Sequence, residues 1–282
     1  MNCLVSPQWL AARLQQPRHA LHVLDASMVQ VVGRVPLEYP QRQVIPGARW
    51  LGLEDYLTDH EASLPNTFPR PEQVTERLQQ LGVNTGDTIV LYDNQGIYSA
   101  PRAWVILKAM GVEQVYLLNG GLPQWLADGL PWATDYLPLP ESRGDVIAQR
   151  QPDWLVDAQH VLAASQQQQA LIVDARGAAR FLGQQPEPRE GMRSGHIPTA
   201  VNLPFQEVLT EHGFRSAEQL AEQFNQLGAT QDTPLITSCG SGITACVLLV
   251  AAHLAGYQQV KLYDGSWAEW GADPQLPIAT GE

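Results

Sequence analysis

The sequence repeats its own landmarks about halfway along, and this internal duplication limits the possible folds more than any other feature. Pairs of short segments recur in the same order in the two halves, at offsets of 145 to 152 residues. The pairs are residues 21–27 with 171–176, 45–48 with 197–200, 80–82 with 226–228, and 119–125 with 264–270. Such ordered agreement is hard to obtain by chance. The chain has 282 residues, so we expect two copies of one domain.

The junction between the two copies is indicated by its prolines. Pro138, Pro140 and Pro152 are separated by polar residues, a composition typical of an extended linker. The predicted boundaries are residues 1–136 for the first domain, 137–154 for the linker and 155–282 for the second domain.

Each half alternates short apolar runs with segments of helical periodicity. The predicted strands include residues 88–92, 114–118, 170–174, 234–238 and 260–263. The predicted helices include residues 71–81, 100–110, 216–227 and 243–254. The strands lack polar–apolar alternation and are separated by helices, which indicates a mostly parallel sheet covered on both faces. The predicted fold class is therefore α/β, with two tandem domains of this type.

The composition argues against several classes of partner. Acidic residues outnumber basic ones by 29 to 17, and the formal net charge is −12, so we expect binding to neither nucleic acid nor an anionic membrane. No stretch reaches the ~18 consecutive apolar residues of a membrane span, and residues 1–13 lack the pattern of a signal peptide.

Three cysteines are too few for a disulfide framework, and the histidines lack metal-ligand spacing. We therefore expect a reduced, cytoplasmic protein with no metal and no organic cofactor.

One loop concentrates the residues suited to catalysis. Cys239 follows a predicted strand and precedes a predicted helix, where open α/β sheets place their sites. Gly240 and Gly242 flank Ser241, which allows the backbone N–H groups to turn inward. Converging N–H groups at a helix N-terminus favour a thiolate, and they also suit a second, negatively charged sulfur. The alternative is that Cys239 is a buried structural cysteine.

The second half also supplies positive charge. Arg176 and Arg180 are one helical turn apart, and Arg189 follows nine residues later in a proline-held loop. Arginine binds carboxylates through two parallel hydrogen bonds. The alternative is pairing with nearby carboxylates such as Glu187. For Arg176, which lies beside Asp174, we favour such pairing, whereas spacing alone leaves both interpretations open for the other two arginines.

These motifs resemble the tandem-domain rhodanese family of sulfurtransferases, and most of all its 3-mercaptopyruvate branch. The resemblance covers nearly the whole chain. It is carried by Pro101-Arg-Ala-Trp104, Asn119-Gly-Gly121, Gly195-His-Ile-Pro198, Cys239-Gly-Ser-Gly-Ile-Thr244 and Tyr263-Asp-Gly-Ser-Trp267. It implies that only the second domain is catalytic. In agreement, Asn94 stands at the position that matches Cys239 at an offset of 145 residues.

The resemblance also implies roles for individual residues. Arg180 and Arg189 would hold the carboxylate and keto groups of 3-mercaptopyruvate, and Cys239 would take its sulfur as a persulfide while pyruvate leaves. A thiol such as thioredoxin or a small thiol, or cyanide in an assay, would then accept the sulfur. The persulfide would be held by the amides of Gly240, Ser241, Gly242, Ile243 and Thr244.

One segment departs from the family pattern. Members often carry a histidine in a Leu-Pro-His segment of the first domain, proposed to act with an upstream aspartate on the loop serine. Here the segment reads Leu64-Pro-Asn66, while Asp55 matches the aspartate. Asparagine cannot carry a proton at neutral pH. We therefore expect Asn66 to hydrogen-bond the substrate or Ser241, and the enolate to be protonated by water or by Ser241.

Three alternative functions differ in how the loop fits them. Relatives that prefer thiosulfate usually carry basic residues at the second and third loop positions, here Gly240 and Ser241. A cysteine phosphatase needs an arginine six residues after the cysteine, where this chain has Ala245. A non-enzymatic sulfur carrier or binding module would leave Cys239 without a catalytic role.

Overall fold

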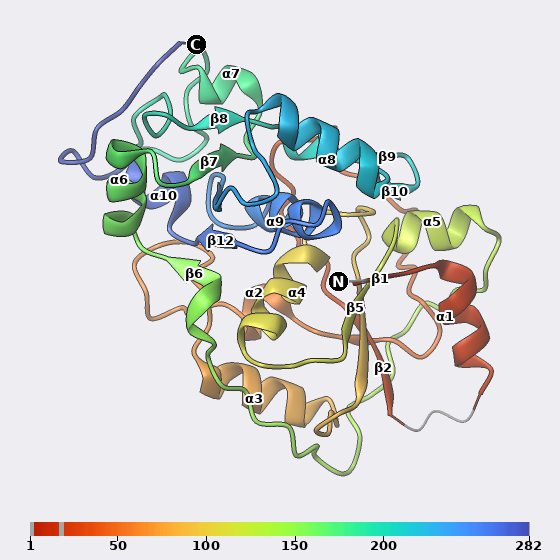
Figure 1. The fold of residues 1–282 in the computed structure, drawn as a ribbon. Coiled ribbons are helices and arrows are strands. Elements are labelled where there is room, and N and C mark those ends of the chain that lie inside the picture. Colours follow the sequence, from red (N-terminus) through yellow and green to blue (C-terminus); the bar gives the residue numbers. More distant parts are fainter. Residues whose placement is uncertain (1–2, 17–19, 282) are drawn as a thin grey trace.

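The computed structural model describes residues 3–16 and 20–281, and it contains two five-stranded parallel sheets (Figure 1). The first sheet has the order β1 (Leu4–Val5), β5 (Val115–Leu118), β4 (Thr88–Tyr92), β2 (Leu21–Asp25) and β3 (Arg49–Trp50). The second has the order β6 (Leu155–Val156), β12 (Val260–Tyr263), β11 (Leu235–Ser238), β7 (Leu171–Asp174) and β8 (Val201–Asn202). All neighbours in both sheets are parallel. The duplicated sequence is thus a duplicated topology, and the α/β fold class is confirmed.

Helices connect the strands of both sheets. In the first half they are α1 (Pro7–Leu14), α2 (Leu53–Tyr56), α3 (Pro71–Gln80), α4 (Ala100–Ala109) and α5 (Gly121–Ala127). In the second half they are η1 (Pro152–Trp154), α6 (Ala158–Gln167), α7 (Ala178–Phe181), η2 (Phe205–Val208), α8 (Ala217–Gln226), α9 (Ala245–Leu254) and α10 (Ser266–Trp270). A short antiparallel hairpin, β9 (Leu209–Thr210) with β10 (Gly213–Phe214), completes the fold.

The predicted elements are all present, with small differences at their ends. Helix α8 begins one residue after Ser216, whose side chain accepts the N–H of Gln219 and caps the helix. Helix α9 begins at Ala245, two residues later than predicted, because Ile243 and Thr244 still belong to the loop that follows β11.

The two halves meet where α4 packs against α9, at the centre of Figure 1. Residues 245–252 of α9 are all buried, which explains why this helix is apolar on every side. The fully buried ring of Trp104 on α4 packs in edge-to-face geometry with Trp154 and His253, at ring-centroid distances of 5.8 Å and 6.1 Å. One apolar core therefore continues across both halves and places the start of α9 at their boundary.

The proposed linker lies along the first half instead of crossing solvent. Gly144 donates its N–H to the carbonyl of Gln79 at the end of α3, and Gln151 donates to Ala109 at the end of α4. Val146 and Ala148 are buried. The proline-rich composition predicts an extended segment but not this packing. We keep residues 137–154 as the proposed connection; the proposed outer limits, residues 1 and 282, lie outside the described residues.

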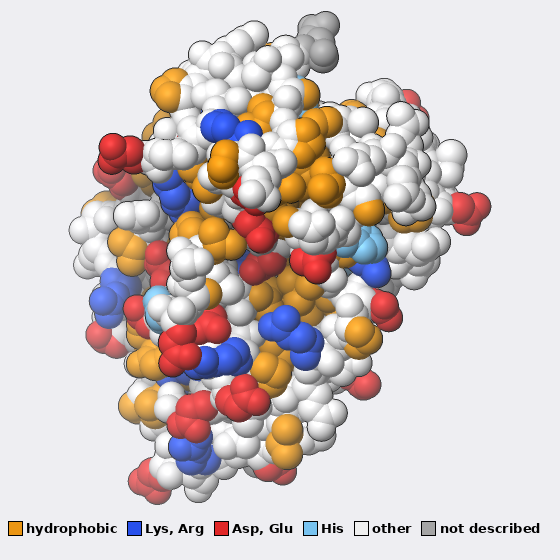
Figure 2. All heavy atoms as spheres, turned by 90° about the vertical axis from the view of Figure 1, so that its left-hand side faces the viewer, with side chains coloured by type: hydrophobic (Ala, Val, Ile, Leu, Met, Phe, Trp, Pro, Cys, Tyr) orange, Lys and Arg blue, Asp and Glu red, His pale blue; other side chains and the backbone are white. Residues whose placement is uncertain are grey.

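Basic side chains on the face shown in Figure 2 lie among acidic ones and form no continuous basic surface.

In residues 3–16 and 20–281, no helix combines the length and the apolar composition needed to cross a membrane.

The shared core predicts a clear difference between two tryptophans. Replacing the fully buried Trp104 with alanine should lower the free energy of unfolding by roughly 3–5 kcal/mol, because it opens a cavity between α4 and α9. Trp132 is 41% exposed, and its replacement should have little effect. Chemical denaturation followed by circular dichroism measures both. Equal stability of the two variants would contradict a core shared between the halves.

Candidate active site

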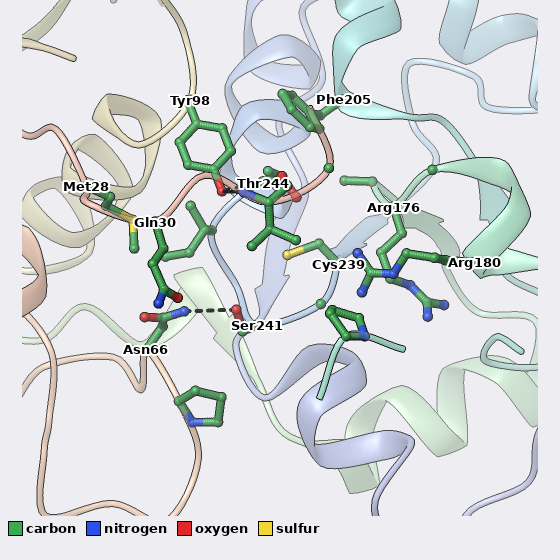
Figure 3. Close-up of a pocket in the computed structure, with 18 of the residues that line it drawn as sticks. Met28, Gln30, Asn66, Tyr98, Arg176, Arg180, Phe205, Cys239, Ser241 and Thr244 are labelled. Atoms are coloured by element: carbon green, nitrogen blue, oxygen red, sulfur yellow. Dashed lines mark hydrogen bonds between the residues drawn. The ribbon is translucent and has the colours of Figure 1, made fainter. Parts of the chain in front are cut away.

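A cavity of about 350 Å³ opens at the carboxyl end of β11, between the two halves (Figure 3). The sulfur of Cys239 points into it, although the residue as a whole is only 2% exposed. The first half contributes, among others, Met28, Gln30, Glu54, Asn66 and Tyr98. The second half contributes Arg176, Arg180, Arg189 and Phe205 together with residues of the cysteine loop, which we define as residues 239–244.

The cysteine loop is held from outside by the start of α10. The carbonyls of Cys239 and Gly240 each accept an N–H from the first turn of α10 at 2.9 Å. The Cys239 N–H donates to the Ser266 hydroxyl at 3.1 Å, and that hydroxyl donates to the Tyr263 carbonyl at 2.9 Å. These bonds satisfy the outer polar groups of the loop and leave its following N–H groups free to turn toward the cavity.

Gly242 lets the loop turn closely enough to do this. Its φ angle of +79° lies in the left-handed region. A side chain would also collide there, because a Cβ atom would lie 2.9 Å from the Asp264 carbonyl oxygen and 3.1 Å from Nη1 of Arg102. Among the residues that the structure describes, none accepts a hydrogen bond from the N–H groups of residues 240–245. Buried N–H groups without partners are costly, so this arrangement suits an anion.

The first half shows the same loop geometry filled by its own carboxylate. Asp93, which matches Ser238, is fully buried, and its Oδ2 accepts the N–H groups of Tyr98, Ser99 and Ala100 at 2.8–2.9 Å. Ser238 is neutral, and its hydroxyl has no partner within the described residues. The matching N–H groups are therefore occupied in one half and available in the other.

A buried arginine from the first half braces the cysteine loop. Arg102 of α4 is 1% exposed and donates to the Asp264 carboxylate at 2.5 Å, to the Gly242 carbonyl at 3.3 Å and to the Asn66 carbonyl at 2.7 Å. The motif that contains Arg102 carries part of the family resemblance, but no role for this residue was predicted from it. Its partners come from three distant segments, so the only clue in the sequence to its importance was that it belongs to the motif Pro101-Arg-Ala-Trp104.

Asn66 and Ser241 lie together, whereas Asp55 lies elsewhere. The Asn66 side chain donates to Oγ of Ser241 at 2.9 Å (Figure 3). Asp55 is exposed on α2 and is not among the residues that line the cavity; its neighbour Glu54 is. Consecutive helical residues point about 100° apart. The alignment of Asp55 with the aspartate of the family motif therefore did not predict the direction of its side chain. The structure thus does not bring Asp55 into the site.

The arginines differ in their partners. Arg176 is buried, donates to Asp174 through Nε and Nη2, and lies 4.3 Å from the centre of the Trp267 ring. This is the pairing favoured from the sequence. Arg180 lines the cavity and also pairs with Glu187.

Arg189 is exposed, lines the cavity, and has no carboxylate partner in the described residues. Of the two arginines expected to bind substrate, one is thus held by a carboxylate and the other is free of one.

The other thiols are unsuited to the same chemistry. Cys246 is fully buried, and burial raises its pKa to about 12; its thiol contacts the Gly242 carbonyl at 3.2 Å. Burial also raises the pKa of Cys3 to about 11. Across the described residues, no group of three or more His, Cys, Asp and Glu is arranged to hold a metal ion.

Comparison with known proteins identifies this arrangement. The sequence profile of the rhodanese-like domain matches residues 6–128 and residues 157–273. The chain belongs to the rhodanese family. The resemblance noted from its motifs is thereby confirmed, and the two sheets are two rhodanese domains.

Individual members of the rhodanese family match over nearly the whole length of this chain. The 3-mercaptopyruvate sulfurtransferase of Escherichia coli K12 is 41% identical, with 97% of this chain and 96% of that one covered. The rat 3-mercaptopyruvate sulfurtransferase is 37% identical, with 99% and 96% covered. The crystal structure of SseA from Escherichia coli superposes with a TM-score of 0.82 at 37% identity, covering 95% of this chain and 99% of that one.

Because Asp93 occupies the matching N–H groups in the first half, we predict that an aspartate at position 238 would occupy those of the cysteine loop. In Ser238→Asp, the new carboxylate should take the N–H groups of residues 243–245, as Asp93 does in the first half. Alkylation of Cys239 by iodoacetamide should then slow by about tenfold or more, since a nearby negative charge disfavours the thiolate. Ser238→Ala is the control, because the hydroxyl has no partner. Equal alkylation rates in the two variants would contradict this account.

Proposed function

We propose that this rhodanese-family protein transfers sulfur from 3-mercaptopyruvate to a thiol through a persulfide on Cys239, with release of pyruvate. The observation that carries the proposal is the run of N–H groups that follows Cys239 and has no acceptor in the described part of the chain, in a cavity also lined by Arg180 and Arg189. The named activity of the Escherichia coli and rat relatives supports the same assignment.

The first step balances without a cofactor. The Cys239 thiolate attacks the substrate sulfur, the carbon–sulfur bond breaks, and the electron pair leaves on carbon as the enolate of pyruvate. The substrate thiol loses one proton and the enolate gains one proton to become pyruvate, so the step neither consumes nor releases protons overall. The products are pyruvate and a Cys239 persulfide anion, and the N–H groups of residues 240–244 stabilise its terminal sulfur. Arg180 and Arg189 bind the carboxylate and keto groups, which holds the two sulfurs in line.

The second step returns the enzyme to its starting state. An acceptor thiolate attacks the terminal sulfur, the sulfur–sulfur bond breaks, and the Cys239 thiolate leaves. We propose a thioredoxin-like dithiol or a small thiol as the acceptor, in a reducing cytoplasm. The first domain is proposed to act as a scaffold without its own chemistry, because Asn94 stands at its cysteine position.

Asn66 takes a positioning role in this scheme. Its amide donates to Ser241, so the Ser241 hydroxyl proton is free to point toward the cavity. An amide cannot relay a proton at neutral pH. The proton therefore reaches the enolate from the Ser241 hydroxyl or from water.

The donor is favoured by the loop and not by overall similarity. Rat thiosulfate sulfurtransferase is also 34% identical over the full chain, with 96% of its own length covered. Gly240 and Ser241 bring no positive charge to the loop, which disfavours the dianion thiosulfate. The donor assignment therefore depends on these two residues and on the arginine pair.

Two measurements test the proposed function together. Exposure to 3-mercaptopyruvate should add one sulfur, about 32 Da, to the whole protein, and pyruvate release should show a larger kcat/KM than thiocyanate formation from thiosulfate and cyanide. The adduct should be absent from Cys239→Ser and retained in Cys3→Ala, since Cys3 lies outside the cavity.

A clear preference for thiosulfate would overturn the donor assignment. If neither the sulfur adduct nor turnover of either donor were detected, the proposal would be wrong and a non-enzymatic binding module would be the remaining alternative.

A further inference from the structure

A buried glutamate lies between two of the arginines that line the cavity, Arg176 and Arg180. The side chain of Glu187 has no exposed area. Its Oε1 accepts from Nη1 of Arg176 at 2.7 Å and from Nε of Arg180 at 3.3 Å, and its Oε2 pairs with Nη2 of Arg180. The proposed function leaves this carboxylate without a role, although both of its arginine partners line the cavity.

Glu187 fixes where Arg180 lies. The carboxylate occupies the Nε–Nη2 edge of the guanidinium and leaves Nη1 without a protein acceptor in the described part of the chain. The same contact holds Nη2 close to the loop, because a Cβ built on Gly240 would lie 3.3 Å from it. The edge that remains is suited to a substrate carboxylate beside Cys239.

Glu187 also sets the charge of the site. Three arginines line the cavity: Arg176, Arg180 and Arg189. Three carboxylates balance these arginines. Asp174 and Glu187 form ion pairs with them, and Glu54 lines the same cavity. Apart from the Cys239 thiolate, the charges of these six side chains therefore cancel. Loss of the Glu187 charge would leave these side chains with one net positive charge.

We propose that Glu187, in addition to the uncharged Gly240 and Ser241, makes this site prefer a monoanionic sulfur donor over a dianionic one, while it positions Arg180. A unit charge interacts twice as strongly with a dianion as with a monoanion at the same distance. Cancelling one positive charge therefore removes more attraction from thiosulfate than from 3-mercaptopyruvate. The donor part of this inference rests on the proposed function.

The variant Glu187→Gln tests the charge with little change of shape. We expect the ratio of kcat/KM for thiosulfate to kcat/KM for 3-mercaptopyruvate to rise by about tenfold at low ionic strength, and the rise to shrink as salt is added. Glu190→Gln removes the same charge from an exposed side chain in the same loop, and its ratio should stay near that of the unmodified protein. An unchanged ratio in Glu187→Gln, or an equal rise in both variants, would overturn the proposal.

A second readout is independent of sulfur transfer. Iodoacetate is a monoanion and iodoacetamide is neutral, so the ratio of their rates with Cys239 at one pH reports the local charge and cancels the thiolate fraction. This ratio should rise severalfold in Glu187→Gln and not in Glu190→Gln. If the unmodified protein failed to use 3-mercaptopyruvate, the proposed function would fall, while the alkylation ratio would still decide the role of Glu187.

The variant Glu187→Asp separates charge from position, and it keeps the proposal testable if Glu187→Gln does not fold. The shorter carboxylate keeps the charge but loses its reach to Arg180. We expect kcat/KM to fall for both donors by the same factor, with an unchanged alkylation ratio. A donor ratio that changed as in a charge-removing variant would contradict the proposed division of roles.

Discussion

The N–H groups of residues 240–245, after β11, have no acceptor among the described residues, and the surrounding structure maintains this arrangement. Peptide N–H groups inside a protein ordinarily find acceptors. Here their outward neighbours, the carbonyls of Cys239 and Gly240, are bonded to α10, so the loop cannot relax by turning over. Gly242 is required by both its φ angle and its close approach to Asp264. The buried guanidinium of Arg102 then fixes the loop from the other domain.

Duplication gave the two halves different tasks on the same scaffold. In the first half, Asp93 satisfies the N–H groups at the start of α4, which makes that loop a stable structural element. In the second half, Ser238 leaves the matching groups available. The first half in turn supplies Arg102 and Asn66 to the catalytic site. The second domain alone would keep the bonds from α10 but would lack the contacts of Arg102 with Gly242 and of Asn66 with Ser241.

Much of the fold and part of the site follow from local sequence. Apolar runs, helix caps and the repeat itself predict the strands and helices, because each depends on residues close in the chain. Cys239 and its glycines are equally local. Arg180 and Arg189 were predicted as site residues and do line the cavity. In contrast, the contacts of Arg102 depend on segments far apart, which no local pattern reveals. Glu187 lies 7 residues after Arg180 and 11 after Arg176, so its pairing with an arginine was an open alternative from the sequence, whereas its burial between both arginines was not predicted. The position of Asp55 shows the same limit, because one step along a helix decides which side chain faces the cavity.

The amide NMR spectrum before and after treatment with 3-mercaptopyruvate tests the central claim most directly. A persulfide held by the loop should move the amide protons of residues 240–245 downfield. The amides of Tyr98, Ser99 and Ala100 should not move, because they are already bonded to Asp93. Unshifted loop amides in protein that carries the extra sulfur, or equal shifts in both halves, would contradict the claim that these N–H groups hold the transferred sulfur.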